Sequence, residues 1–279
     1  MPLFLWSQAI VATVQDILNI LTNIAADSLA ESWDNVGLLL GSPLASVSSI
    51  LIGLDPTSEL LAQASRLNAE VIITHHPLIF HPLKALRTDQ PAGKLISAAV
   101  QKNIHIIGCH TNLDSTVGGV SDVLAKALGV SNPQPLVPSQ NCESACGLGR
   151  TGNLPTPMTA DAFIANLKSA LHPPWLLEAG SRPKHISRVA VCGGSCSDFA
   201  QTAFDDGADV FVTAEIKHST ARWAEEAGMW LIDAGHFATE NPAMEALQQM
   251  LVKQIQKSKL RVQVHLASQE PPLKMITTL

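Results

Sequence analysis

Short apolar runs alternate with amphipathic segments along most of the chain. The apolar runs predict strands, because nearly continuous apolar sequence is typical of strands that helices cover on both faces. They lie at residues 49–55, 70–76, 104–110, 188–194, 209–215, 229–235 and 261–267. Predicted helices lie at residues 58–69, 92–103, 118–129, 159–171, 197–208, 219–228 and 242–258. This alternation predicts an α/β fold with helices packed on both faces of mixed sheets.

The N-terminal segment is apolar but does not have the pattern of a membrane span. Gln15 and Asp16 interrupt it, and no basic region precedes it, so we expect neither an export signal nor a transmembrane helix. Its apolar residues recur at helical spacing, which predicts an amphipathic helix docked on a core. These residues are Ile10, Val14, Ile17, Leu18, Leu21 and Ile24.

The composition changes at residues 131–158, which are rich in Pro, Ser, Asn and Gly. Such a stretch with little periodicity indicates a junction between domains. The strand and helix alternation then starts again. We therefore predict a first α/β half at residues 1–130 and a second at residues 159–279, with no further inserted domain.

The net charge and the cysteine content indicate which partners and which redox environment to expect. With 18 Lys and Arg against 24 Asp and Glu, the net charge of −6 does not favour a nucleic-acid partner. The one basic cluster, Lys253, Lys257, Lys259 and Arg261, is typical of a solvated helix end. The 5 cysteines are an odd number and suit free thiols in a reducing cytoplasm. The alternative is a zinc site made from two C-x3-C pairs, Cys142 with Cys146 and Cys192 with Cys196.

Polar side chains follow three of the predicted strands, at the sheet edge where α/β proteins bind ligands. His75 and His76 follow the first of these strands, His110 and Asp114 the second, and His236 and Glu240 the third. Imidazole and carboxylate are ligands for Zn, Fe, Mn or Co. Because these groups exceed what one ion with an open position requires, two divalent ions fit better than one.

Each of these residues also has an ordinary structural explanation. Asp114 can be a loop carboxylate bonded to its own backbone, and Glu240 can be an acid at a helix N-terminus. Adjacent strand residues face opposite ways, so His75 and His76 can converge only if the strand has already ended. Pro77 favours that ending, because it removes a backbone donor and restricts the residue before it.

Several longer motifs carry a family resemblance. They are ESWDNVGLLLGSP (31–43), ITHHPLIF (73–80), HTNLDSTVGGVSDVLAKALG (110–129), GLGRTGNL (147–154), RVAVCGGSCSDF (188–199), DVFVTAEIKHSTARWA (209–224) and IDAGHFATENPAMEAL (232–247). Together they resemble the NIF-three-like family, whose bacterial members are commonly labelled GTP cyclohydrolase 1 type 2 homologues. The resemblance covers nearly the whole chain in order.

The resemblance implies a set of ligands and an assembly. The dinuclear metal ligands of the family correspond to His75, His76, Asp114, His236 and Glu240 in this sequence. Family members look like two-domain α/β proteins that form toroidal homohexamers, as trimers of dimers. This chain departs from the family at Ala214, where many relatives have Gly, and at Ser219, where some have a second histidine. Neither departure touches the five ligands.

A metal-dependent hydrolase that uses a metal-activated water is the function this set favours, with GTP as one candidate substrate. His110 is the candidate for moving protons, and a hydrogen bond that orients a ligand is its alternative role. Glu215 and His218 are further candidates for substrate contact. The segment QPAGKLIS lacks the earlier Gly of a P-loop. A metal-binding scaffold, metallochaperone or regulatory ring would use the same five ligands without catalysis.

Overall fold

The computed structural model describes residues 11–142 and 145–276. Contacts divide the chain into two compact units. Unit 1 contains the residues up to Asp27, Trp33–His110 and Leu247–Ser268. Unit 2 contains Ser28–Ser32, Thr111–Ala246 and the residues from Gln269 onward. This division differs from the predicted halves at residues 1–130 and 159–279, because the chain returns to unit 1 near its C-terminal end, and it assigns Asp114 to the second unit rather than to the first half.

Unit 1 is built on a five-stranded mixed sheet with the strand order β13-β4-β5-β6-β2. The strands are β2 (Gly37–Leu40), β4 (Ser49–Gly53), β5 (Val71–Thr74), β6 (His105–Gly108) and β13 (Gln263–Leu266). All neighbours pair in parallel except β2, which is antiparallel to β6. A separate pair joins β1 (Ala12–Thr13) to β3 (Ser46–Val47), and the short 3-10 helix η1 spans Asp27–Leu29.

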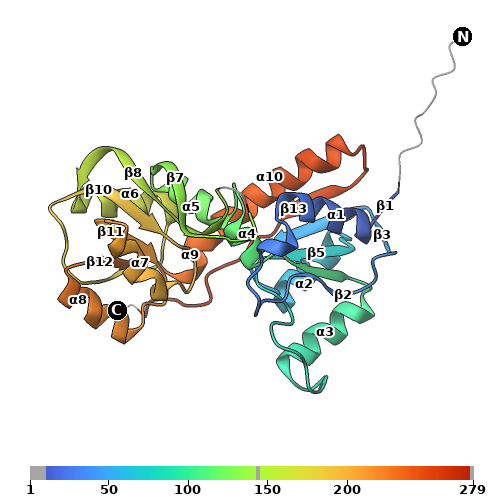
Figure 1. Ribbon diagram of the computed structural model, residues 1–279. Helices are drawn as coiled ribbons and strands as arrows, with labels where there is room; N and C mark the ends of the chain where they lie inside the picture. The colour runs from blue at the N-terminus through green and yellow to red at the C-terminus, as the bar shows by residue number, and fades with distance from the viewer. Residues whose placement is uncertain (1–10, 143–144, 277–279) are drawn as a thin grey trace, which may run out of the picture. The chain divides into compact units, whose positions relative to one another are not determined.

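Helices cover both faces of this sheet, as the apolar runs predict. On one face, α2 (Ser58–Arg66) and α3 (Pro91–Gln101) bury Leu60 and Ala99 against Leu51, Ile72 and Ile106. Figure 1 shows α1 (Val14–Ile24) and α10 (Pro242–Lys257) over the opposite face. The predicted N-terminal helix is confirmed from Val14 onward, whereas Ile10 lies outside the described residues. A capping box between Thr13 and Asp16 fixes where α1 begins.

Unit 2 contains a six-stranded mixed sheet with the order β7-β8-β10-β11-β12-β9. Its strands are β7 (Ser131–Pro138), β8 (Gly147–Thr159), β9 (Leu177–Ala179), β10 (His185–Val191), β11 (Val210–Thr213) and β12 (Trp230–Asp233). Its helices are α4 (Thr111–Ser115), α5 (Val120–Ala127), α6 (Ala160–Leu171), η2 (Ser197–Phe199), α7 (Ala200–Asp205), α8 (His218–Ala227) and α9 (His236–Glu240). The three central strands are parallel, which leaves their carboxyl ends at one edge.

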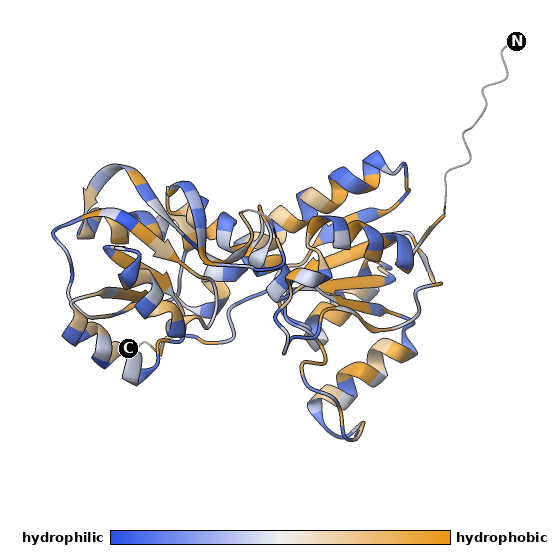
Figure 2. Cartoon of the chain, in the orientation of Figure 1, coloured by the Kyte–Doolittle hydropathy of each residue, from blue (hydrophilic) through white to orange (hydrophobic). Residues whose placement is uncertain are grey.

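Alternate residues of the central strands enter two different cores. Val210 and Val212 pack with α5 and α6, whereas Phe211 packs with α7 and α8. The strands are orange and the outer surfaces of the helices are mostly blue in Figure 2, as expected for a sheet between helical layers. The predicted α/β architecture is therefore confirmed.

The segment at residues 131–158 is not a loose junction. Its described part forms the β7–β8 hairpin at one edge of the second sheet. Pairing shifts register between Ser131 and Gln134, and Pro133, Pro135 and Pro138 lie on the edge strand β7, where the missing backbone donors are tolerated. The Pro-, Ser-, Asn- and Gly-rich composition, from which we predict a domain junction, therefore belongs to an irregular hairpin at the edge of the sheet.

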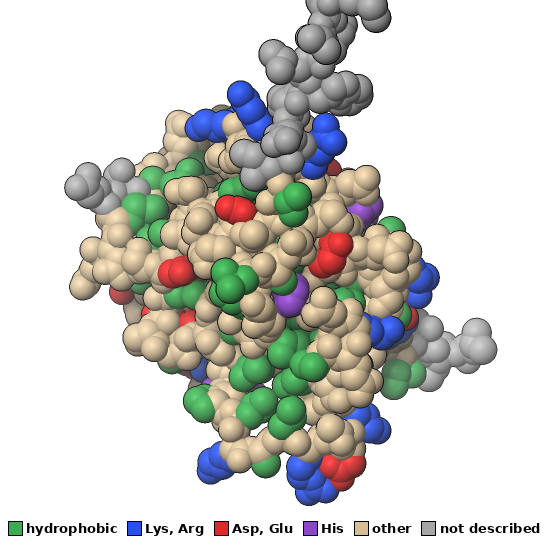
Figure 3. All heavy atoms as spheres, turned by 90° about the vertical axis from the view of Figure 1, so that its right-hand side faces the viewer, with side chains coloured by type: hydrophobic (Ala, Val, Ile, Leu, Met, Phe, Trp, Pro, Cys, Tyr) green, Lys and Arg blue, Asp and Glu red, His purple; other side chains and the backbone are tan. Residues whose placement is uncertain are grey.

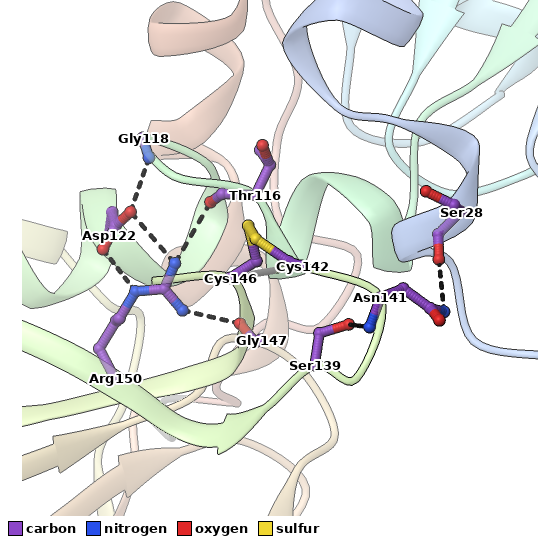
Figure 4. The surroundings of a disulfide bond; sticks show 10 residues. All are labelled: Ser28, Thr116, Gly118, Asp122, Ser139, Asn141, Cys142, Cys146, Gly147 and Arg150. Carbon is purple, nitrogen blue, oxygen red and sulfur yellow. Dashed lines mark hydrogen bonds and ion pairs between the residues drawn. A yellow bond between two sulfur atoms is a disulfide. The ribbon is translucent and has the colours of Figure 1, made fainter. Parts of the chain in front are cut away.

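The cysteines differ from the expectation of free thiols. Cys142 and Cys146 form a disulfide near the tip of the β7–β8 hairpin (Figure 4). Cys109, Cys192 and Cys196 are free. A disulfide removes two of the four thiolates that the alternative zinc site would need, so this structure does not support that site.

On the face drawn in Figure 3, Lys and Arg side chains do not form a continuous basic surface. Lys and Arg side chains are scattered over that face, and apolar side chains gather in its lower part. Within residues 11–142 and 145–276, no helix is long and apolar enough to cross a membrane.

Candidate metal centre

In unit 1, the strand β5 ends at Thr74, immediately before the paired histidines. The Thr74 hydroxyl donates a hydrogen bond of 2.7 Å to the carbonyl of His76 and so fixes the turn that follows the strand. The ring centroids of His75 and His76 are 5.0 Å apart. The two imidazoles therefore lie side by side, as the early end of the strand predicts.

A third imidazole joins this pair from the neighbouring strand. His110 follows β6, and its ring centroid lies 5.1 Å from that of His75 and 5.7 Å from that of His76. One ring nitrogen from each of the three residues lies within 4.8 Å of the others, a spacing that can hold a metal ion. His110, which we predict as a proton carrier, therefore lies beside the two predicted ligands of this unit.

Each of the three imidazoles has an acceptor at its Nδ1 atom. His75 Nδ1 donates to the carbonyl of Cys109 at 2.9 Å. His76 Nδ1 lies 2.7 Å from Asp55 Oδ1, and His110 Nδ1 lies 2.8 Å from Asp34 Oδ1. Because a carbonyl or carboxylate accepts the Nδ1 proton, the Nε2 lone pair of each ring is left for a metal or a proton.

These acceptors were not identified from the sequence as partners of the histidines. Asp55 ends a predicted strand, and Asp34 lies within the ESWDNVGLLLGSP motif. The sequence therefore marked both positions but did not indicate that these residues contact the histidines. Burial and, to a smaller degree, the charge of Asp27 raise the pKa of the Cys109 thiol to about 12. Cys109 therefore serves His75 through its backbone carbonyl while its thiol stays protonated at neutral pH.

A turn near the N-terminus supports the loop that follows the histidines. Asn35 Nδ2 donates a hydrogen bond of 2.5 Å to the carbonyl of Ile79. Asn35 lies in the first family motif, ESWDNVGLLLGSP, together with Trp33 and Gly37. The bond gives Asn35 a role in holding the loop, and it involves no predicted ligand directly.

In unit 2, the short helix α9 brings a histidine and a glutamate together. His236 and Glu240 are four residues apart and therefore share one helix face. His236 Nε2 lies 3.0 Å from Glu240 Oε2, and His236 Nδ1 lies 2.8 Å from Glu215 Oε1. His236 thus resembles His76 and His110 in having a carboxylate at Nδ1, and its Nε2 faces another predicted ligand.

The two carboxylates predicted as ligands create a negative environment in unit 2. Glu240 is 3% exposed. A hydrogen bond with Cys196, burial, the charge on Cys196 and the charges of Asp114 and Glu240 hold the pKa of Cys192 well above its usual value. Both carboxylates therefore act on one buried thiol, and a cation beside them would offset the cost of their burial.

The loop after β10 approaches this pair so closely that it requires glycine. Gly194 has a φ of +69°, and a Cβ atom there would overlap Glu240 Oε1 and lie 3.2 Å from His236 Nε2. The Gly in the CGGSC segment therefore lets the backbone pass beside the two predicted ligands.

We expect Glu215→Ala to weaken metal binding by about 10- to 100-fold, because His236 loses the acceptor that holds its tautomer and ring orientation. Glu215→Gln should restore most of the affinity, since an amide oxygen can also accept the Nδ1 proton. Competition with a chelator of known affinity measures the change. Asp198→Ala removes another exposed carboxylate of unit 2, which pairs with Lys217, and should have no effect. Equal affinities for Glu215→Ala and Asp198→Ala would contradict the role given to Glu215.

Comparison with known proteins shows the family to which the chain belongs. The family model described as Duf34/NIF3 (NGG1p interacting factor 3) matches residues 12–272. A Clostridium perfringens protein named GTP cyclohydrolase 1 type 2 homolog is 35% identical over 231 residues, which cover 83% of this chain and 88% of that protein.

Solved structures have the same fold. A Bacillus cereus protein related to NIF3 superposes with a TM-score of 0.91 at 25% identity, covering 96% of this chain and 100% of the other. A Staphylococcus aureus hypothetical protein gives a TM-score of 0.87 at 30% identity, covering 95% and 99%. With the family model spanning nearly the whole chain, the protein belongs to the Duf34/NIF3 (NGG1p interacting factor 3) family.

Proposed function

We propose that the protein binds two divalent metal ions through His75, His76, Asp114, His236 and Glu240 and uses them to hydrolyse a small molecule. The observation that carries the proposal is the arrangement of the imidazoles, whose Nδ1 atoms each lie at a carbonyl or carboxylate oxygen. Surface histidines do not need such acceptors, whereas metal-binding histidines nearly always have them.

The donor set fits the ions that the sequence predicts. Imidazole nitrogen and carboxylate oxygen suit Zn, Fe, Mn or Co, and the five ligands exceed what one ion with an open position needs. Asp114 and Glu240 each have two carboxylate oxygens, so either can be shared between two ions. When bound, such ions lower the pKa of a coordinated water and polarise the bond under attack.

His110 and Asp34 are the residues of the chain suited to moving a proton during hydrolysis. The Asp34 side chain is fully buried, and its Oδ1 atom accepts from His110 Nδ1 at 2.8 Å. This carboxylate fixes the orientation of the ring, so that its Nε2 atom is available for proton transfer. His110 can then take a proton at Nε2 and later return it to the leaving group.

The substrate class rests on relatives. The Clostridium perfringens relative has the printed name GTP cyclohydrolase 1 type 2 homolog. We extend to this chain the reaction class that this name implies, the hydrolytic opening of a ring in a nucleotide. A non-catalytic metal-binding scaffold, metallochaperone or regulatory ring is the alternative, since it needs the same ligands without turnover. We also propose a homohexamer, on the family resemblance, which light scattering can test.

Purification without chelator, followed by elemental analysis, tests the metal centre. We expect about two ions per chain after reconstitution with Zn, Mn, Co or Fe(II), the last under anaerobic conditions. The metal-loaded protein is then incubated with GTP, and formate release and the loss of the purine absorbance are followed. One ion or none after reconstitution contradicts the dinuclear centre. Two tightly bound ions without turnover of GTP or other nucleotides favour the scaffold.

A further inference from the structure

Unit 2 has a pocket beside His236 that the proposed metal ligands do not account for. It has a volume of about 230 Å³. Its walls come from the segment before β9, the loop after β11, the end of β12, the start of α9 and the described C-terminal segment. The residues that carry the argument are Trp175, Glu215, Asp233, His236, Phe237 and Pro272.

One wall of the pocket is an aromatic face. Trp175 is half-buried, and its indole lies against the backbone of Gly235, where an added Cβ would be 3.8 Å from Trp175 Cζ2. Phe237 and Pro272 also line the pocket. Rigid aromatic and proline surfaces of this kind favour a flat ring, which gains contact with little loss of conformational freedom.

The polar groups in the pocket are chiefly hydrogen-bond acceptors. Asp233 accepts from the backbone N–H groups of Gly235 and Ile216 at 2.9 and 3.1 Å, which fixes its position. Glu215 accepts from His236 and has a positive φ of 54°. Residues other than glycine seldom adopt that conformation, and such strain is concentrated at functional sites. Two fixed carboxylates favour a ligand that carries N–H donors.

We propose that this pocket binds the planar heteroaromatic ring of the substrate, with its N–H donors directed to Glu215 and Asp233 and one face against Trp175. The inference rests on the proposed function and specifies its substrate class. The volume of about 230 Å³ is below the roughly 300–1,000 Å³ of pockets that hold an entire drug-sized ligand. It therefore suits one ring system, with the rest of the substrate outside the pocket.

The pocket is tested by binding, so that the result does not depend on catalysis. Guanosine is the probe, because its ring presents adjacent N–H donors, and 1-methylguanosine is the matched probe that lacks one of them. Calorimetry with the full chain, in metal-loaded and metal-free forms, measures both dissociation constants. We expect guanosine to bind, and 1-methylguanosine to bind at least about 5-fold more weakly, because a carboxylate loses its donor.

Trp175→Ala should weaken guanosine binding by about 5- to 100-fold, the range for one stacked base, and Trp175→Phe should retain most of it. The matched control is Trp223→Ala, which removes another tryptophan of unit 2 that packs on Phe204 outside the pocket. Circular dichroism and thermal unfolding establish that each variant is folded. Unchanged binding in Trp175→Ala, or no guanosine binding in either form of the wild type, overturns the inference. Equal affinity for the two probes overturns the assignment of the carboxylates.

The two proposals fail in distinguishable ways. Guanosine binding that depends on Trp175 in protein without metal supports the pocket even if the elemental analysis contradicts the dinuclear centre. Two bound ions together with no guanosine binding leave the metal centre standing and overturn the pocket alone.

Discussion

Alanine at His75 or His76 is expected to leave about one metal ion per chain, whereas alanine at Asp114 or Glu240 should release both. An imidazole offers one ligating nitrogen to the site because its Nδ1 is engaged elsewhere, so its loss affects chiefly one ion. A carboxylate has two oxygens that can be shared between ions. Elemental analysis of each folded variant measures the effect, and His236→Ala completes the series.

A control for the series is His185→Ala. His185 is an exposed histidine at the start of β10 and should keep the full metal content. Full metal content in both His75→Ala and His76→Ala would show that the paired histidines only terminate a strand. Loss of both ions from either histidine variant would instead show that one imidazole is essential to the whole centre.

The elements that the sequence predicted correctly are those with strong periodicity. All the predicted apolar strands are present, and each is somewhat shorter or shifted, as in β5 at Val71–Thr74 against the predicted 70–76. The helices α4 and α9 were not predicted, because five residues are too few to establish a helical period. These two short helices carry Asp114, His236 and Glu240, so the sequence located these residues but not their helical framework.

Domain boundaries could not be predicted from local composition. Contacts assign residues 247–268, which include most of α10 and all of β13, to unit 1, although they follow unit 2 in the chain. That return depends on the pairing of β13 with β4, between residues such as Val264 and Ile50. Nothing in a local window encodes a partner so far away.

The same limit applies to the candidate metal centre. The histidines could be identified as candidate ligands because they follow predicted strands, and side chains at strand ends project toward a bound ligand. The acceptors Asp34 and Asp55 lie 76 and 21 residues from the histidines that they contact. Local patterns can therefore suggest ligand types, whereas the groups that orient those ligands become visible only in the folded chain.

The second large effect is expected in Asp122→Ala, which should lower the free energy of unfolding by about 3–5 kcal/mol. Asp122 supports the turn that follows α4, the helix that carries Asp114. Arg150 is 1% exposed. Its guanidinium bonds Asp122 at 2.5 and 3.1 Å and donates to the carbonyl of Gly147 at 2.7 Å (Figure 4). It also donates to the carbonyl of Gly149 at 2.7 Å. Asp122 also accepts from the backbone N–H of Gly118, in the turn after α4, at 2.6 Å. Without Asp122, the buried positive charge would have only neutral partners.

Denaturant unfolding measures the loss, and a double variant separates its cause. Asp122→Ala combined with Arg150→Met should be more stable than Asp122→Ala alone, because the double change removes the uncompensated charge as well as the pair. Asp161→Ala breaks an exposed ion pair with Arg182 in the same unit and should cost at most about 1 kcal/mol. If Asp122→Ala cost no more than Asp161→Ala, the Arg150 charge would be compensated by its carbonyl partners alone. The turn after α4 would then not depend on the ion pair, and Asp114 would owe its position to the packing of α4.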